Sequence, residues 1–388
     1  MAIAILPHGS SISVAGPSFG RYIRRSTMAN LKQQRRGTEA ERTFSSPILT
    51  AEVLASRLGL EMAVAGLERI FHQPGDDPPA SAGTSSRRPI RVAYQGVLGS
   101  YCHEAAAVSF PSAAAVEAFP CGARMDAAFS ALEDGSADRA VVPAENSLDG
   151  PIVRNLDLLL RYPAVRICGE LVVPVNHCLL AAPGADLADL RRVVSHPQAL
   201  RHCDRRIESL DLYVEEVADA AEAARAVAED GIRDTAVIGS RMAAKEFGLR
   251  VLEPNFQDDA GNYTRFLQLS MSAGTASGNV VPGGGARKTT VAFSLEKGVS
   301  DLCRAMSFFE NRGVPVTRVD HRPNRANPVR FENRTGLGSV VQMDYVFLVD
   351  VEGSESDRAV AAAVARLEET AVFVRVLGSY GSTCCSSG

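Results

Sequence analysis

Several features that would point to a particular class of protein are missing from this sequence. No window approaches the ~20 continuous apolar residues that a membrane-spanning helix needs. The formal net charge is only −4, so the chain has no surplus of basic residues for binding nucleic acid or an anionic membrane. Its eight cysteines include no C-x-x-C pair, and the adjacent Cys384 and Cys385 have poor geometry for a disulfide bond. We therefore expect free thiols and a reducing compartment.

The N-terminal segment lacks acidic residues. The first 38 residues contain six basic residues, many hydroxyl side chains and no Asp or Glu. They also lack the apolar core of a secretory signal, so their composition is typical of an organelle transit peptide. A plain disordered tail is the alternative. Residues 50–71 have the apolar spacing of a helix, residues 73–88 are typical of a polar linker, and we assign residues 1–89 to a transit peptide and linker.

The rest of the sequence has the length and composition of a soluble protein with more than one domain: 388 residues in all, 46% apolar and 22% charged. From residue 90, the short apolar runs IRVAY, RAVVPA, RRVVS and DTAVIG alternate with segments that predict helices beginning near Tyr101, Gly150, His196 and Ser240. This alternation predicts an α/β domain over residues 90–272 with mostly parallel sheets. Ligands of such sheets bind at the carboxyl ends of the strands, so polar residues after each run are candidate site residues.

A Gly- and Ser-rich stretch, residues 273–287, marks the clearest domain boundary. After it, strands and helices are predicted in the order β-α-β-β-α-β over residues 288–381, and residues 382–388 are predicted to be a tail. The predicted strands are TTVAFSL, VPVTRVDHRP, VVQMDYVFLVDVEG and FVRVLGSY, with helices near residues 300–311 and 355–370. This order is that of the ferredoxin-like split βαβ arrangement, and a module of this size suits the sensing of a small ligand.

Two polar segments directly follow predicted strands. GVLGSY, which ends in Gly99, Ser100 and Tyr101, offers glycines for a tight turn and helix N-terminal N–H groups that attract anions. A carboxylate ligand would suit this loop, and a structural turn explains it equally well. PAENSLDG contains Glu145 and Asn146, which combine an acid with a neutral hydrogen-bonding group; a turn with helix caps is the alternative.

Two further segments also allow both a structural and a functional interpretation. In SHPQAL, Ser195 and Gln198 have the spacing of a capping box with a proline in the first turn. The N–H groups that begin the predicted helix would also suit an anion. In NYTRF, Thr264 and Arg265 open a predicted strand, and an arginine beside a hydroxyl can bind a carboxylate and donate a hydrogen bond to an oxygen. Because threonine and arginine are commonplace on strands, neither segment is diagnostic alone.

Taken in this order, the segments resemble the motifs of the prephenate dehydratase family, including the plant arogenate dehydratases. The resemblance covers residues 91–380 and rests on YQGVLGSY, VPAENSLDGPIVRNLDLLL, NHCLL, SHPQAL and NYTRFL. It implies an α/β fold whose catalytic domain is two-lobed and periplasmic-binding-protein-like, with its site between the lobes. It also implies that the ferredoxin-like βαββαβ module is an ACT domain, which senses phenylalanine in these enzymes.

The function implied by the resemblance is that of a carbon–oxygen lyase of phenylalanine biosynthesis in the chloroplast stroma. Such an enzyme converts arogenate to phenylalanine, or prephenate to phenylpyruvate, by removing water and CO2 from a non-aromatic ring. Aromatisation drives the reaction, so no cofactor or metal is needed, and the expected partner is a small-molecule substrate. The resemblance also implies a homo-oligomer, a dimer or tetramer, formed through the ACT domains. A paralogue with weakened catalysis and a solute-binding protein of two-lobed fold are the alternatives.

The resemblance also assigns roles to individual residues. Thr264 is the threonine of the family's T-R-F motif, and its hydroxyl would donate a hydrogen bond to the departing oxygen in the transition state. Asn146 would orient the ring, with Glu145 as a charged helper. The remaining implied residues are Ser195 and His202 in catalysis, Arg265, Phe266, Gly99, Ser100, Tyr101 and Gln198 in substrate binding, and Ser300, Asp301, Leu302, Asp320, His321, Arg322 and Pro323 in effector binding.

Several positions depart from the family pattern. His202 stands where the family usually has glutamine, Cys102 where it has serine, and Asp149 where plant relatives commonly have glycine. In the C-terminal module, Asp320-His321-Arg322-Pro323 replaces E-S-R-P, and the turn at residues 298–302 is one residue longer than the family's G-A-L-V-like turn. The first two changes bear on the catalytic rate. The altered C-terminal motifs predict that phenylalanine is a weak effector or none.

We predict that the N-terminal segment directs import into plastids and is then removed, because it is basic, hydroxyl-rich and free of acidic residues. A fluorescent protein fused behind residues 1–90 should accumulate inside plastids as a shortened product. The same reporter fused behind residues 91–180 is the control and should remain in the cytosol. Cytosolic fluorescence of the first fusion would contradict the assignment.

Overall fold

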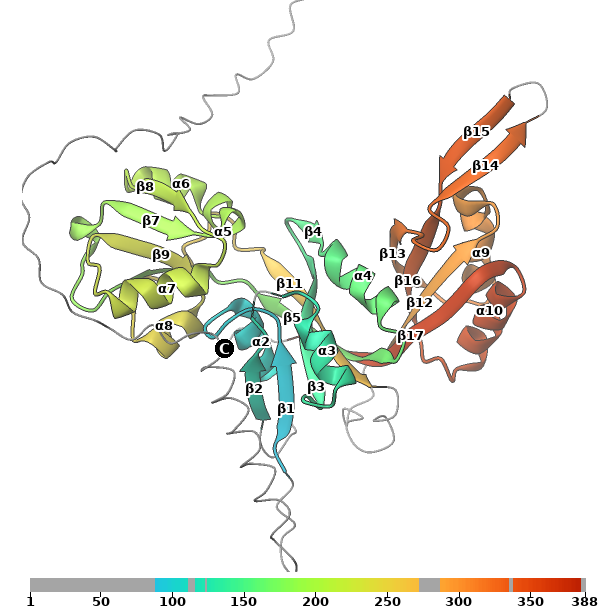
Figure 1. Cartoon of the computed structure of the whole chain (residues 1–388), viewed down its shortest axis with the longest axis horizontal. Coiled ribbons are helices and arrows are strands. Elements are labelled where there is room, and N and C mark those ends of the chain that lie inside the picture. Colours follow the sequence, from blue (N-terminus) through green and yellow to red (C-terminus); the bar gives the residue numbers. More distant parts are fainter. Residues whose placement is uncertain (1–87, 111–115, 123, 272–286, 335–337, 385–388) are drawn as a thin grey trace, which may run out of the picture. The chain divides into compact units, whose positions relative to one another are not determined.

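The computed structural model describes residues 88–110, 116–122, 124–271, 287–334 and 338–384. The predicted transit peptide, the predicted helix at residues 50–71 and all but the last residue of the predicted linker lie outside these ranges. Within them, the chain has a mixed α/β fold, as expected, with a ten-stranded sheet, a five-stranded sheet and a two-stranded hairpin (Figure 1). None of the described helices is both long and apolar enough to cross a membrane. We call residues 88–271 the N-terminal α/β region and residues 287–384 the C-terminal module.

One part of the ten-stranded sheet belongs to the N-terminal α/β region and has the strand order β5-β11-β3-β1-β2. β1 pairs in parallel with β2 and β3, whereas β11 lies antiparallel between β3 and β5. Helix α2 covers one face, and α3 and α4 cover the other. Burial on both faces explains the nearly continuous apolar runs of β1 and β3. The elements are β1 (Ile90–Tyr94), α2 (Tyr101–Val108), β2 (Val116–Pro120), α3 (Ala127–Glu133), β3 (Arg139–Asn146), β4 (Gly150–Pro151), α4 (Val153–Arg161), β5 (Val165–Pro174) and β11 (Tyr263–Met271).

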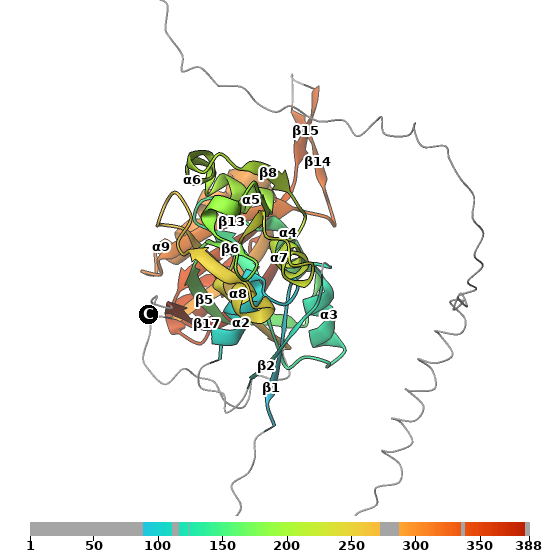
Figure 2. The ribbon, with the colours of Figure 1, turned by 90° about the vertical axis from the view of Figure 1, so that its left-hand side faces the viewer.

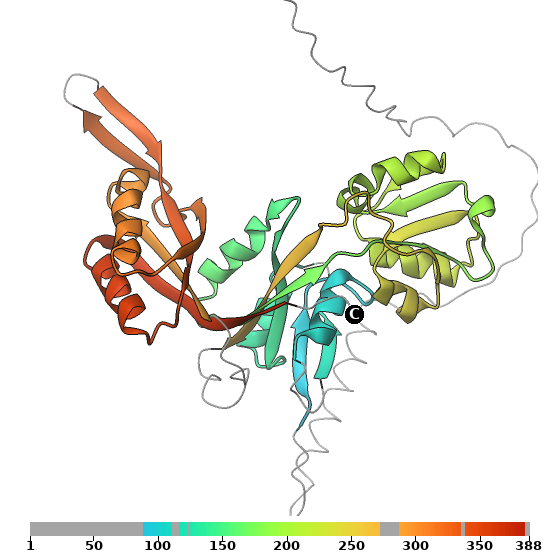
Figure 3. The same ribbon diagram turned by 180° about the vertical axis from the view of Figure 1, so that it is seen from behind.

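The five-stranded sheet completes the N-terminal α/β region, with the order β10-β6-β9-β7-β8. Side chains of β6 alternate between its faces, so Leu179 packs against α5 and α6 and Leu180 against α7 and α8. Figure 3 shows this sheet from behind, in green and yellow, between its helices. The elements are β6 (Cys178–Ala181), η1 (Leu187–Asp189), β7 (Arg192–Ser195), α5 (Pro197–Arg201), α6 (Asp204–Ser209), β8 (Tyr213–Glu216), α7 (Ala220–Glu229), β9 (Thr235–Gly239), α8 (Arg241–Phe247) and β10 (Arg250–Glu253).

The C-terminal module has the predicted order of strands and helices, and its strands lie in the order β13-β16-β12-β17. Helices α9 and α10 cover one face, over a core that includes Phe293, Phe309 and Leu367. A hairpin, β14–β15, is inserted between β13 and β16 and extends away from this sheet (Figure 2). The elements are β12 (Arg287–Leu295), η3 (Gly298–Asp301), α9 (Leu302–Glu310), β13 (Val316–Pro323), β14 (Val329–Arg334), β15 (Gly338–Met343), β16 (Tyr345–Glu352), α10 (Arg358–Glu368) and β17 (Ala371–Cys384).

The C-terminal module and the first sheet of the N-terminal α/β region share a core. β17 continues to Cys384 and pairs in parallel with β5, so residues 382–384 belong to the sheet rather than to the predicted tail. Leu348 and Leu377, on the face of the module opposite its helices, are buried in one cluster with Leu158 and Leu267 of the N-terminal α/β region. The strand that ends the chain therefore joins the two parts by both backbone pairing and apolar contact.

Two predictions about strands are wrong. The sheets of the N-terminal α/β region are mixed rather than mostly parallel, because β5, β6, β10 and β11 add antiparallel pairs where the chain passes from one sheet to the other and back. The segment VVQMDYVFLVDVEG forms two strands, β15 and β16, that are interrupted at Asp344. The carboxylate of Asp344 is buried and accepts hydrogen bonds from Arg330 and Asn324, and this tertiary contact leaves no trace in the apolar pattern.

We predict that Gly378→Ala destabilises the junction between β17 and β5. A Cβ at Gly378 would overlap the backbone carbonyl of Ile167, so the two strands must separate. The free energy of unfolding should fall by about 2 kcal/mol in a denaturant titration. Gly381→Ala, on the same strand with nothing within 4 Å of the added Cβ, is the matched control. Equal stability of the two variants would contradict the packing described.

Candidate active site

The register between β3 and β11 determines which of the predicted residues meet. It pairs Thr264 with Asn146 and Arg265 with Glu145. Directly opposed residues of two antiparallel strands share a face, and successive residues alternate between faces. Thr264 and Asn146 therefore lie on one face, and Arg265 and Glu145 on the other. The four polar residues, which the sequence analysis placed in one site, therefore lie on opposite faces of the β3–β11 pair.

Asn146 is held in one orientation by the backbone that follows it. Its Oδ1 accepts hydrogen bonds from the N–H groups of Leu148 at 2.9 Å and Asp149 at 3.0 Å. Such an Asx-type turn fixes which end of the amide is oxygen and which is nitrogen. The Nδ2 group must then donate on the opposite side, where it reaches Asn262 Oδ1 at 2.7 Å and Thr264 Oγ1 at 3.1 Å.

The hydroxyl of Thr264 is consequently oriented as a donor. Its oxygen accepts from Asn146 Nδ2, so its own hydrogen is free to be donated to another oxygen. Thr264 is 9% exposed, which places the hydroxyl in a largely dehydrated environment where a hydrogen bond to developing negative charge is strong. Asn146 thus positions the Thr264 hydroxyl and leaves its hydrogen available for donation.

The same reasoning assigns the protons on two histidines. Asn262 Oδ1 faces Asn146, so Asn262 Nδ2 faces His202 Nδ1 at 3.2 Å. His202 Nδ1 must accept, which places the ring proton on Nε2. His177 Nε2 lies 3.2 Å from the same nitrogen and, as a second donor, shares its single lone pair with Asn262. His177 Nδ1 then accepts from the hydroxyl of Tyr101 at 2.5 Å. We use the name Tyr101–Thr264 chain for this series of hydrogen-bonded side chains: Tyr101, His177, His202, Asn262, Asn146 and Thr264.

Burial keeps the side chains of Tyr101 and His177, at one end of the Tyr101–Thr264 chain, uncharged. Desolvation, followed by repulsion from His202, lowers the pKa of His177 to about 4. Its ring is therefore uncharged near neutral pH, as the assigned hydrogen-bond directions require. Burial also raises the pKa of Tyr101 well above its ordinary value, so the phenol retains the proton that it donates to His177.

Two of the departures from the family pattern meet in this site. His202 Nε2 lies 3.0 Å from Asp149 Oδ2, within ion-pair distance although not aligned for a hydrogen bond. The other oxygen of Asp149 lies 3.2 Å from Arg201 Nη2. The proton that the chain places on His202 Nε2 therefore faces a carboxylate. The presence of Asp149, where plant relatives commonly have glycine, is therefore explained by His202, which stands where the family usually has glutamine.

Arg265 does not lie beside the Thr264 hydroxyl, contrary to expectation. Its Nε donates to Glu170 Oε2 at 2.6 Å, and its Nη2 lies 2.8 Å from Asp350 Oδ2 and 3.0 Å from the Tyr380 hydroxyl. Burial alone would lower the pKa of Arg265, but Asp350, Tyr380 and Glu170 raise it above its ordinary value. Strand alternation places this guanidinium in a buried ion cluster, and its contact with a substrate carboxylate stays a prediction.

Phe266 and Glu145 also lie away from the Thr264 hydroxyl. Phe266 is 3% exposed and packs in the core beneath α2, so its predicted contact with substrate is replaced by a structural one. Glu145 Oε2 accepts from Arg318 Nε of the C-terminal module at 2.9 Å. This carboxylate faces the module because Glu145 shares the face of Arg265.

Ser195 and Gln198 do not form the predicted capping box. Ser195 is fully buried, and its hydroxyl donates to the carbonyl of Ile238 in β9 at 2.6 Å. The N-cap of α5 is His196, whose Nδ1 accepts from the N–H of Gln198, and Pro197 occupies the first turn as predicted. The Ser195 hydroxyl thus links β7 to β9, and its part in catalysis stays a prediction. Gln198 is exposed, and its contact with substrate stays a prediction.

The glycine-containing loop before α2, GVLGSY, positions Tyr101 in the Tyr101–Thr264 chain. Gly99 has a φ of +80°, and a Cβ there would lie 2.9 Å from Phe247 Cε2, so only glycine fits. Its carbonyl accepts from Ser240 Oγ at 2.6 Å. Ser100 caps α2 by accepting from the N–H of His103. Gly99 and Ser100 thus fix the start of the helix that carries Tyr101, and direct substrate contact by either residue stays a prediction.

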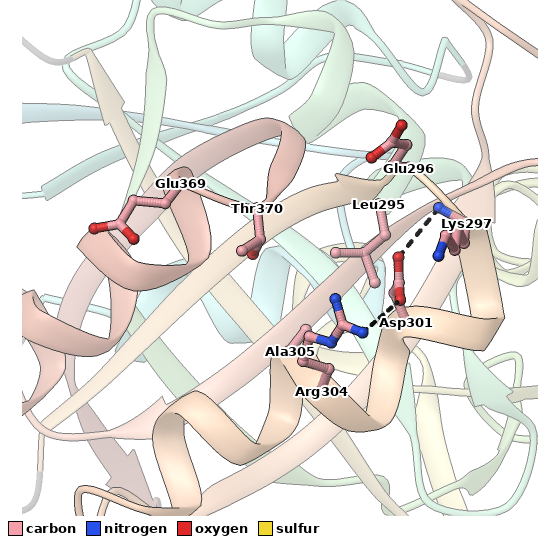
Figure 4. Close-up of a pocket in the computed structure, with 8 residues that line it drawn as sticks. All are labelled: Leu295, Glu296, Lys297, Asp301, Arg304, Ala305, Glu369 and Thr370. Carbon is pink, nitrogen blue, oxygen red and sulfur yellow. Dashed lines mark hydrogen bonds and ion pairs between the residues drawn. The ribbon is translucent and has the colours of Figure 1, made fainter.

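The predicted effector turn borders a pocket of about 250 Å³ in the C-terminal module (Figure 4). Asp301 lines it together with Leu295, Arg304 and Thr370. Its carboxylate accepts from the N–H of Lys297 at 3.3 Å and lies 3.9 Å from Arg304. Ser300 is exposed and Leu302 half-buried, and neither lines this pocket. Part of the negative charge of Asp301 is therefore offset by its neighbours.

The second predicted effector motif lies on β13, where alternate side chains face opposite ways. Asp320 accepts from Arg318 at 2.6 Å, and Arg322 Nε donates to Asp157 of α4 at 2.6 Å. His321 lies on the exposed side, edge-on to the ring of Tyr345, and Pro323 is exposed beside it. Arg322 therefore ties this motif to the N-terminal α/β region.

Arg330 and Asp344 connect the two effector motifs. Arg330 Nη2 donates to the carbonyl of Leu295 at 2.8 Å and to Asp344 Oδ1 at 2.6 Å, close beneath Gly298. Asp344 Oδ2 accepts from Asn324 Nδ2 at 2.9 Å, directly after the motif on β13. The turn and the motif, which are separate in sequence, are thus adjacent at one edge of the module.

His177 and Asn262 belong to the site but were not predicted. They are 2% and 1% exposed, and both lie inside segments that carry the family resemblance, NHCLL and NYTRFL. That location was the available signal. A single buried histidine or asparagine is most often a satisfied structural residue, so only the spatial contacts with Asn146 and His202 reveal their role.

The site contains polar groups but no arrangement that suits a metal. Over residues 88–110, 116–122, 124–271, 287–334 and 338–384, no group of three or more His, Cys, Asp or Glu side chains is placed to hold a metal ion. Six cysteines in these ranges carry free thiols: Cys102, Cys121, Cys168, Cys178, Cys203 and Cys303.

A mixed α/β chain with a threonine donor held by an asparagine matches a known class of lyase. The sequence profile of the family described as prephenate dehydratase matches residues 92–273. The chain is 44% identical over 292 residues to arogenate dehydratase/prephenate dehydratase 2, chloroplastic, of Arabidopsis thaliana. This match covers 75% of this chain and 72% of the Arabidopsis protein. The chain belongs to the prephenate dehydratase family.

Two solved structures resemble the fold at 29% identity. A prephenate dehydratase from Arthrobacter aurescens in complex with L-Phe has a TM-score of 0.63 and covers 75% of this chain and 90% of that chain. GqqA, described as a novel type of quorum-quenching acylase, has a TM-score of 0.64 and covers 76% of this chain and 98% of that chain. The matched portion extends beyond the family profile into the C-terminal module.

We predict that His202→Gln leaves kcat/KM for dehydration within about twofold of the wild-type value, or raises it. Glutamine Oε1 can accept from Asn262 and His177, and its Nε2 can donate to Asp149, so the hydrogen-bond directions persist. His202→Leu is the control; it removes the acceptor and should lower kcat/KM about tenfold. A large drop for His202→Gln in a steady-state assay would show that the imidazole itself takes part in the reaction.

Proposed function

We propose that this protein is a chloroplast arogenate/prephenate dehydratase, a carbon–oxygen lyase of phenylalanine biosynthesis. The observation that carries this proposal is the Thr264 hydroxyl, whose oxygen accepts from Asn146 and whose hydrogen is free to be donated. Membership of the prephenate dehydratase family supports the substrate class. The name of the Arabidopsis relative supports both the paired activities and the chloroplast location.

The proposed reaction needs a donor rather than a strong acid. The ring carboxylate leaves as CO2, and the electrons of its C–C bond move into the ring as the C–O bond at the opposite ring carbon breaks. Negative charge develops on the departing oxygen, where the Thr264 hydroxyl donates a hydrogen bond. Because the ring becomes aromatic in this step, stabilising the leaving oxygen is the main task of the protein, and the departing hydroxide takes up a proton to become water.

We infer that the two sheets of the N-terminal α/β region are the lobes of a periplasmic-binding-protein-like domain. The chain passes between the sheets twice, after β5 and after β10, and residues from both sides meet in the Tyr101–Thr264 chain. We also infer that the C-terminal module, with its βαββαβ order, is an ACT domain, and that ACT domains join subunits into a dimer or tetramer. Sedimentation that shows a monomer at micromolar concentration would contradict the last inference.

The alternative, a paralogue with weakened catalysis, has less support. It rested on His202 and Cys102 in place of the family's residues. In the structure, His202 fulfils the acceptor role that glutamine could fill, and Asp149 compensates its Nε2 proton. The donor arrangement at Thr264 is complete.

The function is tested by adding prephenate or arogenate to the purified protein and following the ultraviolet absorbance of the aromatic product. We predict turnover by the wild type and a loss of about 10²–10³-fold in kcat for Thr264→Ala with little change in KM. Thr264→Ser keeps the hydroxyl and is the control, with most of the activity retained. Turnover of Thr264→Ala close to the wild-type value would refute the mechanism, and no turnover by the wild type would refute the function.

We expect phenylalanine to be a weak effector of this enzyme. The Arthrobacter structure was solved in complex with L-Phe, but here the first effector turn carries Asp301 and the second motif lacks Glu and Ser. Fewer contacts give the ligand less preference for one conformational state. Isothermal titration with phenylalanine, run beside activity assays, should show weak binding and weak inhibition. Strong inhibition at micromolar phenylalanine would contradict this expectation.

A further inference from the structure

The C-terminal module contacts the strand that carries Asn146. β13 has alternating half-buried and exposed residues, and Arg318, Asp320 and Arg322 lie on its half-buried side. Arg318 is 13% exposed in its side chain, and its Nε donates to Glu145 Oε2 at 2.9 Å. Its Nη2 donates to Asp320 Oδ2 at 2.6 Å, so the guanidinium is fixed from both sides.

Glu145 lies at the point where β3 most needs an anchor. The pairing of β3 with β11 shifts register between Arg265 and Phe266, which leaves Ala144 outside the regular pairs. Pro143, the residue before it, has no N–H to donate to the neighbouring strand. A bulge of this kind bends the strand and re-aims the side chains that follow it. On its other side the end of β3 pairs with the two-residue strand β4, Glu145 with Pro151 and Asn146 with Gly150. Backbone support on that side is therefore limited to a short strand, and a side-chain contact can add to it.

The ion pair supplies this anchor on the face opposite the reaction. Glu145 precedes Asn146, and its carboxylate lies between Arg318 at 2.9 Å and Arg265 Nη1 at 3.8 Å. Asn146 in turn holds the Thr264 hydroxyl at 3.1 Å. A displacement of Glu145 therefore moves the amide that orients the donor, and a misplacement near 1 Å at a reacting group can cost about 10²-fold in rate.

We propose that Arg318 is a positioning residue for the dehydration: from the C-terminal module, it holds Glu145 and so sets the position of Asn146 and Thr264. This inference rests on the proposed function. It assigns to Glu145 a structural partner on the module in place of the charged contact with substrate that the sequence suggested. It also makes the intact C-terminal module part of the machinery that aligns the catalytic hydroxyl, whether or not an effector is bound.

A double-mutant cycle on the full-length protein tests this proposal. Arg318→Gln and Glu145→Gln should each lower kcat about tenfold with KM nearly unchanged, and the double variant should be no slower than the slower single variant. Arg318→Lys, which keeps the charge, should recover part of the lost kcat. Glu355→Gln is the matched control; it breaks the ion pair between Glu355 of the module and Arg166 of β5 at 2.8 Å, near the other end of β11, and should leave kcat unchanged.

The outcomes separate this inference from the function on which it rests. An inactive wild type removes both. An active wild type with an unchanged kcat for Arg318→Gln overturns the positioning role alone. Effects of Arg318→Gln and Glu145→Gln that multiply in the double variant would also overturn it, because Glu145 would then act independently of Arg318. Circular dichroism checks that each variant is folded. If Arg318→Gln fails to fold, Arg318→Met, which keeps the aliphatic part of the side chain but not the charge, takes its place in the cycle, and an unchanged kcat for it would refute the proposal.

Discussion

The antiparallel register of β3 with β11 is the constraint on which the rest of the structure depends. It sets Thr264 opposite Asn146 and Arg265 opposite Glu145. One face of this strand pair then carries a hydrogen-bonded donor, and the other carries a pair of charges. A slip of one residue would exchange the two faces. The Asx turn after Asn146 adds direction to this arrangement, because it determines which end of the amide reaches Thr264 and, through Asn262, which nitrogen of His202 accepts.

The charged face explains why the C-terminal module is joined so closely to the N-terminal α/β region. Arg265 and Lys288 lie against Glu170 and Asp350 in a nearly dry junction. Removing one member of a buried ion pair leaves an uncompensated charge and is strongly destabilising, whereas the complete set is balanced. The shared apolar cluster and the pairing of β17 with β5 strengthen the same junction. The strand that carries Thr264 is thus supported from the module side.

The sequence predicted the elements better than the contacts. Strands such as β1 and β9, the C-terminal order of elements and the family were predicted correctly because apolar runs and short motifs are local signals. The β14–β15 hairpin was missed because its cause, the burial of Asp344 against Arg330, is a tertiary contact. The contacts of Arg265, Phe266 and Ser195 could not be predicted, because neighbours in sequence do not show which groups a side chain meets in the fold. Asp149 could be explained only once His202 was found beside it.

The central claim is that the Tyr101–Thr264 chain has one hydrogen-bond direction, which leaves the Thr264 hydroxyl as a donor. The most direct measurement is nitrogen-15 NMR of protein labelled at histidine, with signals assigned through His202→Gln and His177→Gln. The account predicts that His177 is neutral near pH 7 and that the rings of His177 and His202 both carry a proton on Nε2 and accept at Nδ1. A proton on Nδ1 of His202 would reverse the hydrogen bond with Asn262 and, through Asn146, contradict the donor role of Thr264.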